Sequence, residues 1–269
     1  MSVLSGNPDV TGSHRAIEEI SLNTWPARQT LLLNGWIVRF ADGYTKRANS
    51  VYPLCFHPGA DLEQTIARAE AFFSEHRLNA VFKLTPFAVP QELDRVLEER
   101  GYRCCDACEV MTRDLDEVPA PAPGEARIRD RLDGEWLDAF AAFDGLSPHH
   151  RTIAERLLTE AVLRQGFALV FRDGAPVACG LGVIQDETMA LYNIVTDPRW
   201  RGRGYGKQLM LQLLAWGKRN GAKRAFLQVL RSNEPALALY RKLGFRTAYS
   251  YWYRVKPFVP PPDADVSEK

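Results

Sequence analysis

The feature that most constrains the fold is the stretch of residues 190–210, ALYNIVTDPRWRGRGYGKQLM. An apolar run typical of a buried strand leads into a loop with three glycines, Gly202, Gly204 and Gly206, and a long amphipathic helical pattern follows. Glycines let backbone N–H groups approach an anion closely, and the first turn of a helix presents unpaired N–H groups at the positive end of its dipole. The sequence therefore predicts a phosphate-binding turn between a strand and a helix.

Three cationic side chains, Arg201, Arg203 and Lys207, add positive charge beside this turn. Two common phosphate motifs do not fit it. A GxGxxG dinucleotide fingerprint fails because the third glycine falls one position early, and a P-loop fails at both ends, where Arg201 and Gln208 stand. Binding of RNA through this cluster is a further alternative, although one short basic run on a chain of net charge +1 is weak evidence for it.

The same residues resemble the GNAT superfamily of N-acetyltransferases. Arg201-x-x-Gly204-x-Gly206 matches the pyrophosphate-binding signature Arg/Gln-x-x-Gly-x-Gly/Ala of that superfamily. Downstream, Asn233 opens a helix and Tyr240 lies one turn before a Gly-Phe pair, as in the superfamily's next element. The resemblance covers residues 126–256. It implies an acyltransferase that moves an acetyl group from acetyl-CoA to a primary amine by direct attack in a ternary complex.

The resemblance also implies roles for individual residues. The backbone of Ile194, Val195 and Thr196 would pair with the pantetheine arm of acetyl-CoA like an added strand. The pyrophosphate would be held by Arg201, Gly202, Arg203, Gly204, Tyr205, Gly206 and Lys207. Asn233 would reach the pantetheine arm, with a plain helix N-cap as the alternative. Tyr240 would be the general acid and contact the cofactor, because a phenol with a pKa of about 10 can donate to the thiolate sulfur; a core tyrosine is its alternative.

The general base is where this chain departs from the resemblance. Some peptide-acetylating members have a Glu in the strand before Asn233, but here that strand carries Gln228, which cannot accept a proton usefully. The candidates elsewhere are His149 or His150, in the loop after the first helix of the C-terminal half, and Glu187. An imidazole with a pKa of about 6.5 suits the task. Because no base is evident, a non-catalytic module that binds and senses acyl-CoA is the alternative function.

The segment VPAPAPGEA at residues 118–126 divides the chain. Residues 62–114 and 208–255 share one pattern, in which an amphipathic helix ends at glycine, an aromatic residue follows and an extended run closes the domain. The sequence predicts two tandem GNAT-like α/β (α+β) domains, each a mixed, mainly antiparallel sheet flanked by helices. The expected boundaries are a flexible segment at 1–20, a degenerate structural domain at 21–118, a linker at 119–125, the catalytic domain at 126–257 and a disordered tail at 258–269.

Within the first domain, residues 31–40 and 44–54 are expected to pair as strands. The loop at residues 55–61, CFHPGAD, lacks the arginine and glycines of the signature, so this domain is expected to bind no cofactor.

The composition limits the partners. The chain is 46% hydrophobic and 25% charged with no basic excess, which argues against a nucleic-acid-binding protein. No apolar run reaches the about 18 residues that span a bilayer, and the start has no signal-peptide pattern. The five cysteines include a single CxxC, so neither a disulfide framework nor a metal site is expected. We expect a cytoplasmic monomer or homodimer that uses acetyl-CoA, a small-molecule or peptide amine acceptor, and no metal, nucleic acid or membrane.

Overall fold

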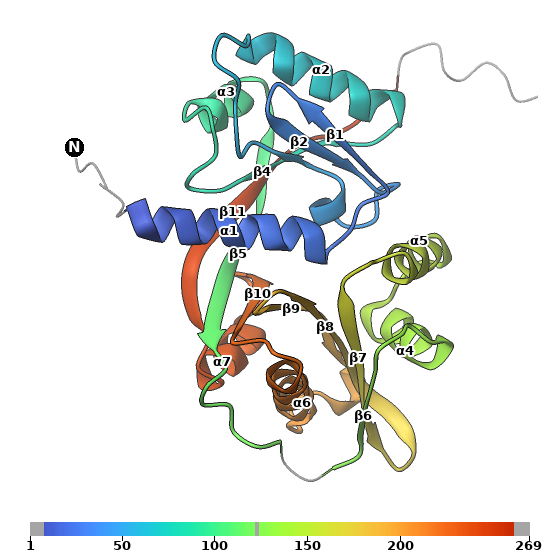
Figure 1. The fold of residues 1–269 in the computed structure, drawn as a ribbon. Coiled ribbons are helices and arrows are strands. Elements are labelled where there is room, and N and C mark those ends of the chain that lie inside the picture. Colours follow the sequence, from blue (N-terminus) through green and yellow to red (C-terminus); the bar gives the residue numbers. More distant parts are fainter. Residues whose placement is uncertain (1–7, 122–123, 261–269) are drawn as a thin grey trace, which may run out of the picture. The chain divides into compact units, whose positions relative to one another are not determined.

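The computed structural model describes residues 8–121 and 124–260 of the chain, which form two compact units (Figure 1). One unit combines the chain up to Pro26 with Cys108–Ser250, and the other combines Ala27–Ala107 with the chain from Tyr251. These boundaries differ from the expected domains at 21–118 and 126–257. Residues 1–7, 122–123 and 261–269 of the expected N-terminal segment, linker and tail lie outside the described residues.

The first unit is built on a mixed sheet in which all described strand pairs but one are antiparallel. Neighbouring strands in this part of the sheet follow the order β6-β7-β8-β9-β10-β5. Of these pairs, only β9 and β10 run parallel. The strands are β5 (Arg103–Asp114), of which residues 108–114 belong here, β6 (Ala126–Arg129), β7 (Arg164–Arg172), β8 (Ala175–Gln185), β9 (Thr188–Thr196), β10 (Arg224–Leu230) and β11 (Arg246–Lys256), of which residues 246–250 belong here.

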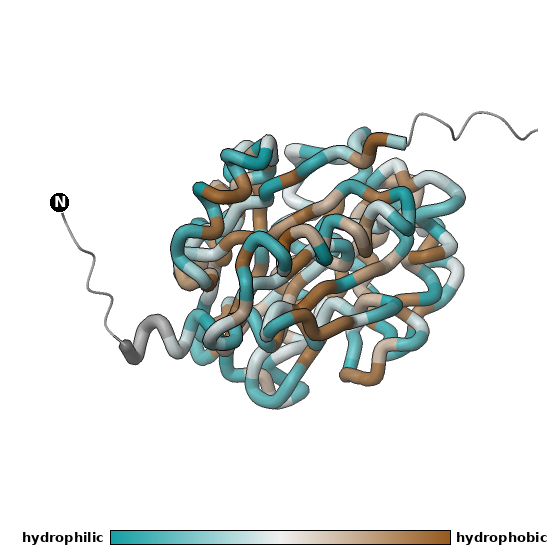
Figure 2. The backbone as a smooth tube through the Cα atoms, turned by 90° about the horizontal axis from the view of Figure 1, so that it is seen from above, coloured by the Kyte–Doolittle hydropathy of each residue, from teal (hydrophilic) through white to brown (hydrophobic). Residues whose placement is uncertain are grey.

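Helices cover both faces of this sheet (Figure 1). The described helices of the unit are α1 (Pro8–Thr24), α4 (Gly134–Asp144), α5 (Pro148–Thr159), α6 (Tyr205–Arg219) and α7 (Glu234–Lys242). A Cβ added at Gly180 of β8 would lie 3.0 Å from the Leu213 side chain of α6, whereas Trp136 of α4 packs on Phe167 of β7 with ring centroids 5.1 Å apart. Because side chains alternate along a strand, α6 and α4 therefore cover opposite faces. Figure 2 shows hydrophobic and hydrophilic stretches alternating along the backbone.

The N-terminal helix is more extensive than the sequence indicated. Residues 1–20 were expected to be flexible, but α1 runs from Pro8 to Thr24 and contacts β8 and β9. Its Ile17, Glu18, Ser21 and Thr24 are buried. Buried positions three and four residues apart mark one helix face. The face was hard to predict because most of its residues are polar.

The second unit repeats the plan of the first. Two antiparallel pairs, β1 with β2 and β2 with β3, are followed by the parallel pair β3–β4. The elements are β1 (Gln29–Leu33), β2 (Trp36–Phe40), a short 3-10 helix (Lys46–Ala48), β3 (Val51–Tyr52), α2 (Leu62–Glu75), β4 (Ala80–Leu84) and α3 (Leu93–Glu99). The expected pairing of residues 31–40 with 44–54 is confirmed only for β2 with β3, and a second turn divides residues 31–40 into β1 and β2. The turn lies at Asn34 and Gly35, whose positive φ values of 48° and 90° suit a tight hairpin turn.

The two halves of the chain exchange their closing strands. In the first unit β10 pairs antiparallel with residues 108–114 of β5, which come from the N-terminal half. In the second unit β4 pairs antiparallel with residues 252–256 of β11 (Arg246–Lys256), which come from the C-terminal half. Each extended run that was expected to close its own domain therefore contributes its last part to the other unit.

No helix among the described residues is both long and apolar enough to cross a membrane. No three His, Cys, Asp or Glu side chains of the described chain gather as metal ligands would.

Candidate active site

Strands β9 and β10 part in the middle of the sheet. Their parallel ladder runs from Thr188 and Arg224 to Leu191 and Leu227 and ends there. Strand β9 nevertheless stays paired with β8 up to Thr196. The backbone edge of residues 192–196 that faces β10 is thus outside the ladder, which is the kind of edge that accepts an extended ligand as an extra strand.

A β-bulge lies on the other side of the same segment. The register between β8 and β9 shifts between Cys179 and Leu181, where Asn193 has a φ of +50°. Bulges bend a strand and re-aim its residues, and they are frequent beside active sites. The Nδ2 atom of Asn193 is buried and has no hydrogen-bond partner among the described residues. Sequence reasoning missed Asn193; an asparagine inside an apolar strand is the signal that could have found it.

The glycine loop follows directly. Gly202 and Gly204 have φ values of 75° and 87°, and a Cβ at either position would meet no atom within 4 Å, so the space before α6 is open. Gly204 is the N-cap of α6. A Cβ at Gly206 would lie 3.4 Å from the Thr196 hydroxyl and 3.5 Å from the Leu239 side chain. The first turn of α6 therefore sits against both the end of β9 and helix α7.

Cationic side chains surround this loop. Arg201, Arg203 and Lys207 are exposed, and Arg201 Nε donates to the Thr196 carbonyl at 3.4 Å. The Arg203 guanidinium stacks 4.8 Å from the Trp200 ring centre. Positive charge and unpaired helix N–H groups together favour an anion at this point.

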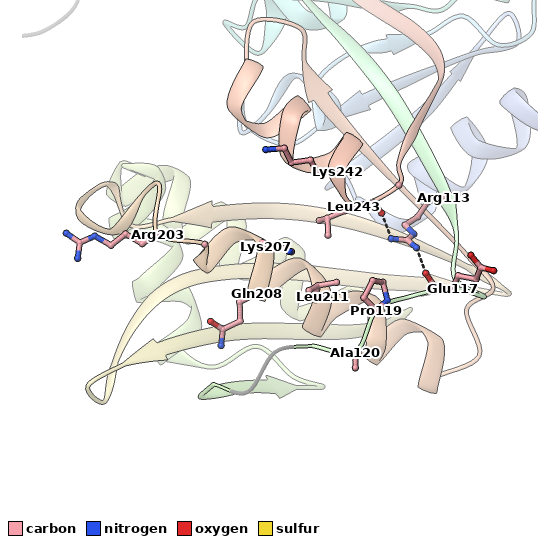
Figure 3. Close-up of a pocket in the computed structure, with 12 residues that line it drawn as sticks. Arg113, Glu117, Pro119, Ala120, Arg203, Lys207, Gln208, Leu211, Lys242 and Leu243 are labelled. Carbon is pink, nitrogen blue, oxygen red and sulfur yellow. Dashed lines mark hydrogen bonds between the residues drawn. The ribbon is translucent and has the colours of Figure 1, made fainter.

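A pocket of about 590 Å³ lies between α6 and the end of α7 and begins at the glycine loop (Figure 3). Figure 3 shows Lys207 and Leu211 on α6 facing the end of α7 at Leu243. Arg113 forms part of the wall, because it donates to the Leu243 carbonyl and, at 2.9 Å, to that of Glu117. Lys207 and Lys242, by contrast, have no ion pair or hydrogen bond to the rest of the described chain, so their charges are available to a ligand.

Helix α7 places the two downstream site residues. The Asn233 side chain accepts a hydrogen bond from Ala236 N at 3.2 Å, so Asn233 is the N-cap of α7. Tyr240 is 7% exposed, and burial raises the pKa of its phenol to about 12. Its ring packs 6.1 Å from Phe245, and its hydroxyl has no hydrogen-bond partner in the described part of the chain. The side chain of Leu239, the residue before it, reaches Gly206.

The structure separates the three candidate bases. His149 and His150 lie in the first turn of α5, where Ser147 is the N-cap, and their rings are 5.8 Å apart. Glu187 lies in the turn between β8 and β9 and pairs with Lys223 at 2.5 Å. Nine residues of extended strand, about 30 Å, separate Glu187 from Thr196 at the glycine loop. The structure therefore does not bring Glu187 to the site.

Two hydroxyls of α1 hold the strands where they part. Gln228, the residue after Leu227 in β10, donates from Nε2 to Ser21 Oγ at 2.7 Å. Tyr192, the residue after Leu191 in β9, shares a buried hydrogen bond of 2.8 Å with Thr24 Oγ1. Sequence reasoning missed this role of α1, although serine and threonine three residues apart were visible in the sequence.

Comparison with known proteins identifies the group to which this arrangement belongs. Residues 11–254 match the family model described as probable histone acetyltransferase Rv0428c, C-terminal. The chain is 30% identical to an uncharacterized N-acetyltransferase, YobR, of Bacillus subtilis over 246 residues, which cover 90% of this chain and 98% of that protein.

Solved structures show the same fold. A GCN5-related N-acetyltransferase from Kribbella flavida superposes with a TM-score of 0.68 at 16% identity, covering 97% of this chain and 99% of the other. A tandem GNAT protein from the clavulanic acid biosynthesis pathway superposes with a TM-score of 0.60 at 17% identity, covering 79% of this chain and 76% of the other. The chain is therefore an acyltransferase, a GNAT N-acetyltransferase that belongs to the Rv0428c C-terminal acetyltransferase family.

Proposed function

We propose that the unit around Cys108–Ser250 moves an acetyl group from acetyl-CoA to a primary amine of a small molecule or peptide, by direct attack in a ternary complex. The observation that carries this proposal is that the gap between β9 and β10 is followed in the chain by the open glycine loop. The ladder between β9 and β10 ends at Leu191, and a few residues later the open glycine loop begins at the N-terminus of α6.

The residues present fit acetyl-CoA from end to end. The free edge at Ile194, Val195 and Thr196 offers backbone groups to the amides of the pantetheine arm. The segment from Arg201 to Lys207 offers N–H groups and cations to the pyrophosphate. The pocket between α6 and α7, with Lys207 and Lys242 uncompensated, suits the remaining phosphate and the nucleotide. Asn233 serves α7 as an N-cap with its side-chain oxygen and keeps its amide N–H groups for the pantetheine arm.

Tyr240 acts as the acid in this proposal. Its raised pKa of about 12 keeps the phenol protonated at neutral pH. A thiol has a pKa of about 8.5, so complete proton transfer from this phenol to a solvated thiolate is uphill by more than about three pKa units. Tyr240 therefore works mainly by donating a hydrogen bond as negative charge develops on the sulfur, which lowers the barrier to breaking the C–S bond.

The unit around Ala27–Ala107 has a structural role in this proposal. Helix α2 occupies the position that α6 has in the other unit, but its N-terminus is already capped. The carboxylate of Asp61 accepts from Gln64 N at 2.8 Å, and Glu63 adds a second negative charge in the first turn. A phosphate would meet like charge at this helix end, whereas the N-cap of α6 is a glycine.

The proposal is tested by thiol release. Purified protein, acetyl-CoA and a panel of small amines and peptides with free N-termini or lysines should give free CoA and an acetylated amine, with saturation in both substrates. Binding of acetyl-CoA without turnover across the panel would instead favour the non-catalytic sensing module. Salt-dependent RNA binding that acetyl-CoA does not displace would favour the RNA-binding alternative.

The α1 hydroxyls give a separate prediction. The double variant Ser21→Ala, Thr24→Val removes the two hydrogen bonds that hold Gln228 and Tyr192 at the opening, together with the bond from Thr24 Oγ1 to the Ile20 carbonyl. We expect the free energy of unfolding to fall by about 2 kcal/mol, and the KM for acetyl-CoA to rise several-fold because the opening loses its fixed width. Denaturation curves and initial rates measure the two effects. Ser13→Ala, at an exposed position of the same helix, is the control. An unchanged KM in the double variant would remove α1 from cofactor binding.

A further inference from the structure

Asp144 is the last residue of α4 and is held in a fixed place. The helix is closed by Gly145, which has a φ of 71° and donates from its backbone N–H to the Ala141 carbonyl. The next residue, Leu146, donates to the same carbonyl at 3.0 Å. Two hydrogen bonds to one carbonyl make this a rigid helix end. Helix α4 packs on β8 and β9, so Asp144 ends a rigid element that lies on two strands of the proposed site.

The Asp144 carboxylate lies near β8, the strand on the paired side of β9. Its charge raises the pKa of the buried Cys179 thiol, in addition to the larger effect of burial. Cys179 pairs in register with Val195 of β9. Gly180 faces α6, so its neighbour Cys179 and the paired Val195 face the opposite side, which α4 covers. Asp144 is thus on the face away from α6, near the β8 residue that pairs with Val195 of the segment that would hold the pantetheine arm.

This face is where an amine would have to approach. Helices α6 and α7 and the glycine loop occupy the other face and would hold the cofactor. Asp144 is exposed, so a substrate can reach it. Among the described residues it has no ion pair and no hydrogen bond to its side chain, whereas Asp138 of the same helix pairs with Arg151 at 2.6 Å.

The surroundings make the Asp144 carboxylate more basic than an ordinary one. Local desolvation raises its pKa. Its position at the negative end of the α4 dipole acts in the same direction, because unpaired carbonyls there disfavour a negative charge. An acidic residue at this end costs stability, so its position calls for a reason other than folding. The other titratable groups on the elements packed against α4 are Cys179 on β8, Tyr192 on β9, Arg164 and Arg172 at the ends of β7, and His149, His150, Arg151, Glu155 and Arg156 on α5.

We propose that Asp144 is the general base that deprotonates the acceptor amine, an inference that rests on the proposed function. The carboxylate takes one proton from the ammonium, and the freed nitrogen lone pair attacks the thioester carbonyl carbon, forming the C–N bond. As the C–S bond breaks, its electron pair goes to sulfur, toward which the Tyr240 hydroxyl donates. The nitrogen loses its second proton, so the products are an amide, a free thiol and one proton released to solvent.

The experiment compares Asp144→Asn, Asp144→Glu and the control Asp138→Asn. At neutral pH, Asp144→Asn should lower kcat/KM for the amine at least about a hundredfold, while the affinity for acetyl-CoA and the Tm stay at or above the wild-type values. Its residual rate should rise about tenfold per pH unit toward the pKa of the amine, about 10.4 for a lysine side chain, because free amine needs no base. Asp144→Glu should recover part of the rate, and Asp138→Asn should keep it.

Other outcomes overturn the inference in distinguishable ways. A rate for Asp144→Asn within about threefold of wild type, with turnover intact, removes Asp144 but leaves the proposed function standing. A loss of rate together with a lowered Tm and no recovery at high pH assigns Asp144 to folding. Absence of turnover in the wild type, with acetyl-CoA bound, contradicts the proposed function itself.

Discussion

Replacing Gly204 with glutamate is expected to remove acetyl-CoA binding. The φ of 87° at Gly204 is a left-handed value that costs other residues about 1–2 kcal/mol. The larger effect is electrostatic, because the new carboxylate would occupy the open space at the N-terminus of α6, where the pyrophosphate would bind. Together these effects should raise the Kd at least about a hundredfold, a change of about 2.7 kcal/mol, measured by calorimetry.

The chain offers a matched control for this substitution. Gly59 lies in the corresponding loop of the other unit, also at a left-handed φ, of 80°, and a Cβ there would likewise meet nothing within 4 Å. Gly59→Glu therefore imposes the same strain and charge where no cofactor is proposed, and it should leave the affinity unchanged. Gly204→Ala separates strain from charge. If Gly204→Glu bound acetyl-CoA as tightly as wild type, the cofactor site would have to lie elsewhere.

The glycine loop was predictable because its chemistry is local. The strand, the three glycines and the helix are continuous in the sequence, and the structure places Gly204 at the start of α6 as that order requires. Asn233 and Tyr240 were also within reach, since both lie on the helix that follows the next strand. The sequence could not show that the hydroxyl of Tyr240 stays unpaired at the end of a buried side chain, because that depends on how α7 packs.

What could not be predicted depends on contacts between distant segments. The closing runs of the two halves follow the same pattern, so their sequences cannot say which sheet each one joins. Their length was the available clue: β5 has 12 residues and β11 has 11, about twice an ordinary strand. Such strands have enough residues for each of them to contribute to both units. Helix α1 was missed for a similar reason, because its polar face is buried only by partners some 170 to 230 residues away.

The general base shows the limit of arguing from residue type. His149, His150 and Glu187 have side chains that suit proton transfer, but residue type cannot say which of them lies near the opening of the sheet. Glu187 lies in the turn between β8 and β9, where it pairs with Lys223. Asp144 drew no attention in the sequence because an exposed aspartate before a glycine is typical of a helix end. The role that we propose for Asp144 rests on its place at the end of α4, which packs on β8 and β9, and only the fold reveals that place.

Tyr240→Phe is expected to lower kcat by about tenfold to a hundredfold, at the lower end of what acid assistance contributes. The substitution keeps the ring packing against Phe245 and removes only a hydroxyl that has no partner in the described chain. The KM for acetyl-CoA should change little, because the hydrogen bond strengthens only as charge develops on the sulfur. The protein should remain as stable as the wild type, since no internal hydrogen bond is lost.

Two further measurements separate this role from packing. The loss should shrink with an acyl donor that has a better leaving group, because its sulfur or oxygen needs less help to depart. The wild-type rate should show no alkaline fall due to Tyr240 below about pH 11, since an acid works in its protonated form and burial raises the pKa of this phenol to about 12. If Tyr240→Phe kept kcat within about threefold of wild type while chemistry was rate-limiting, Tyr240 would be a core residue, and the departing sulfur would have to be stabilised by water or by another donor.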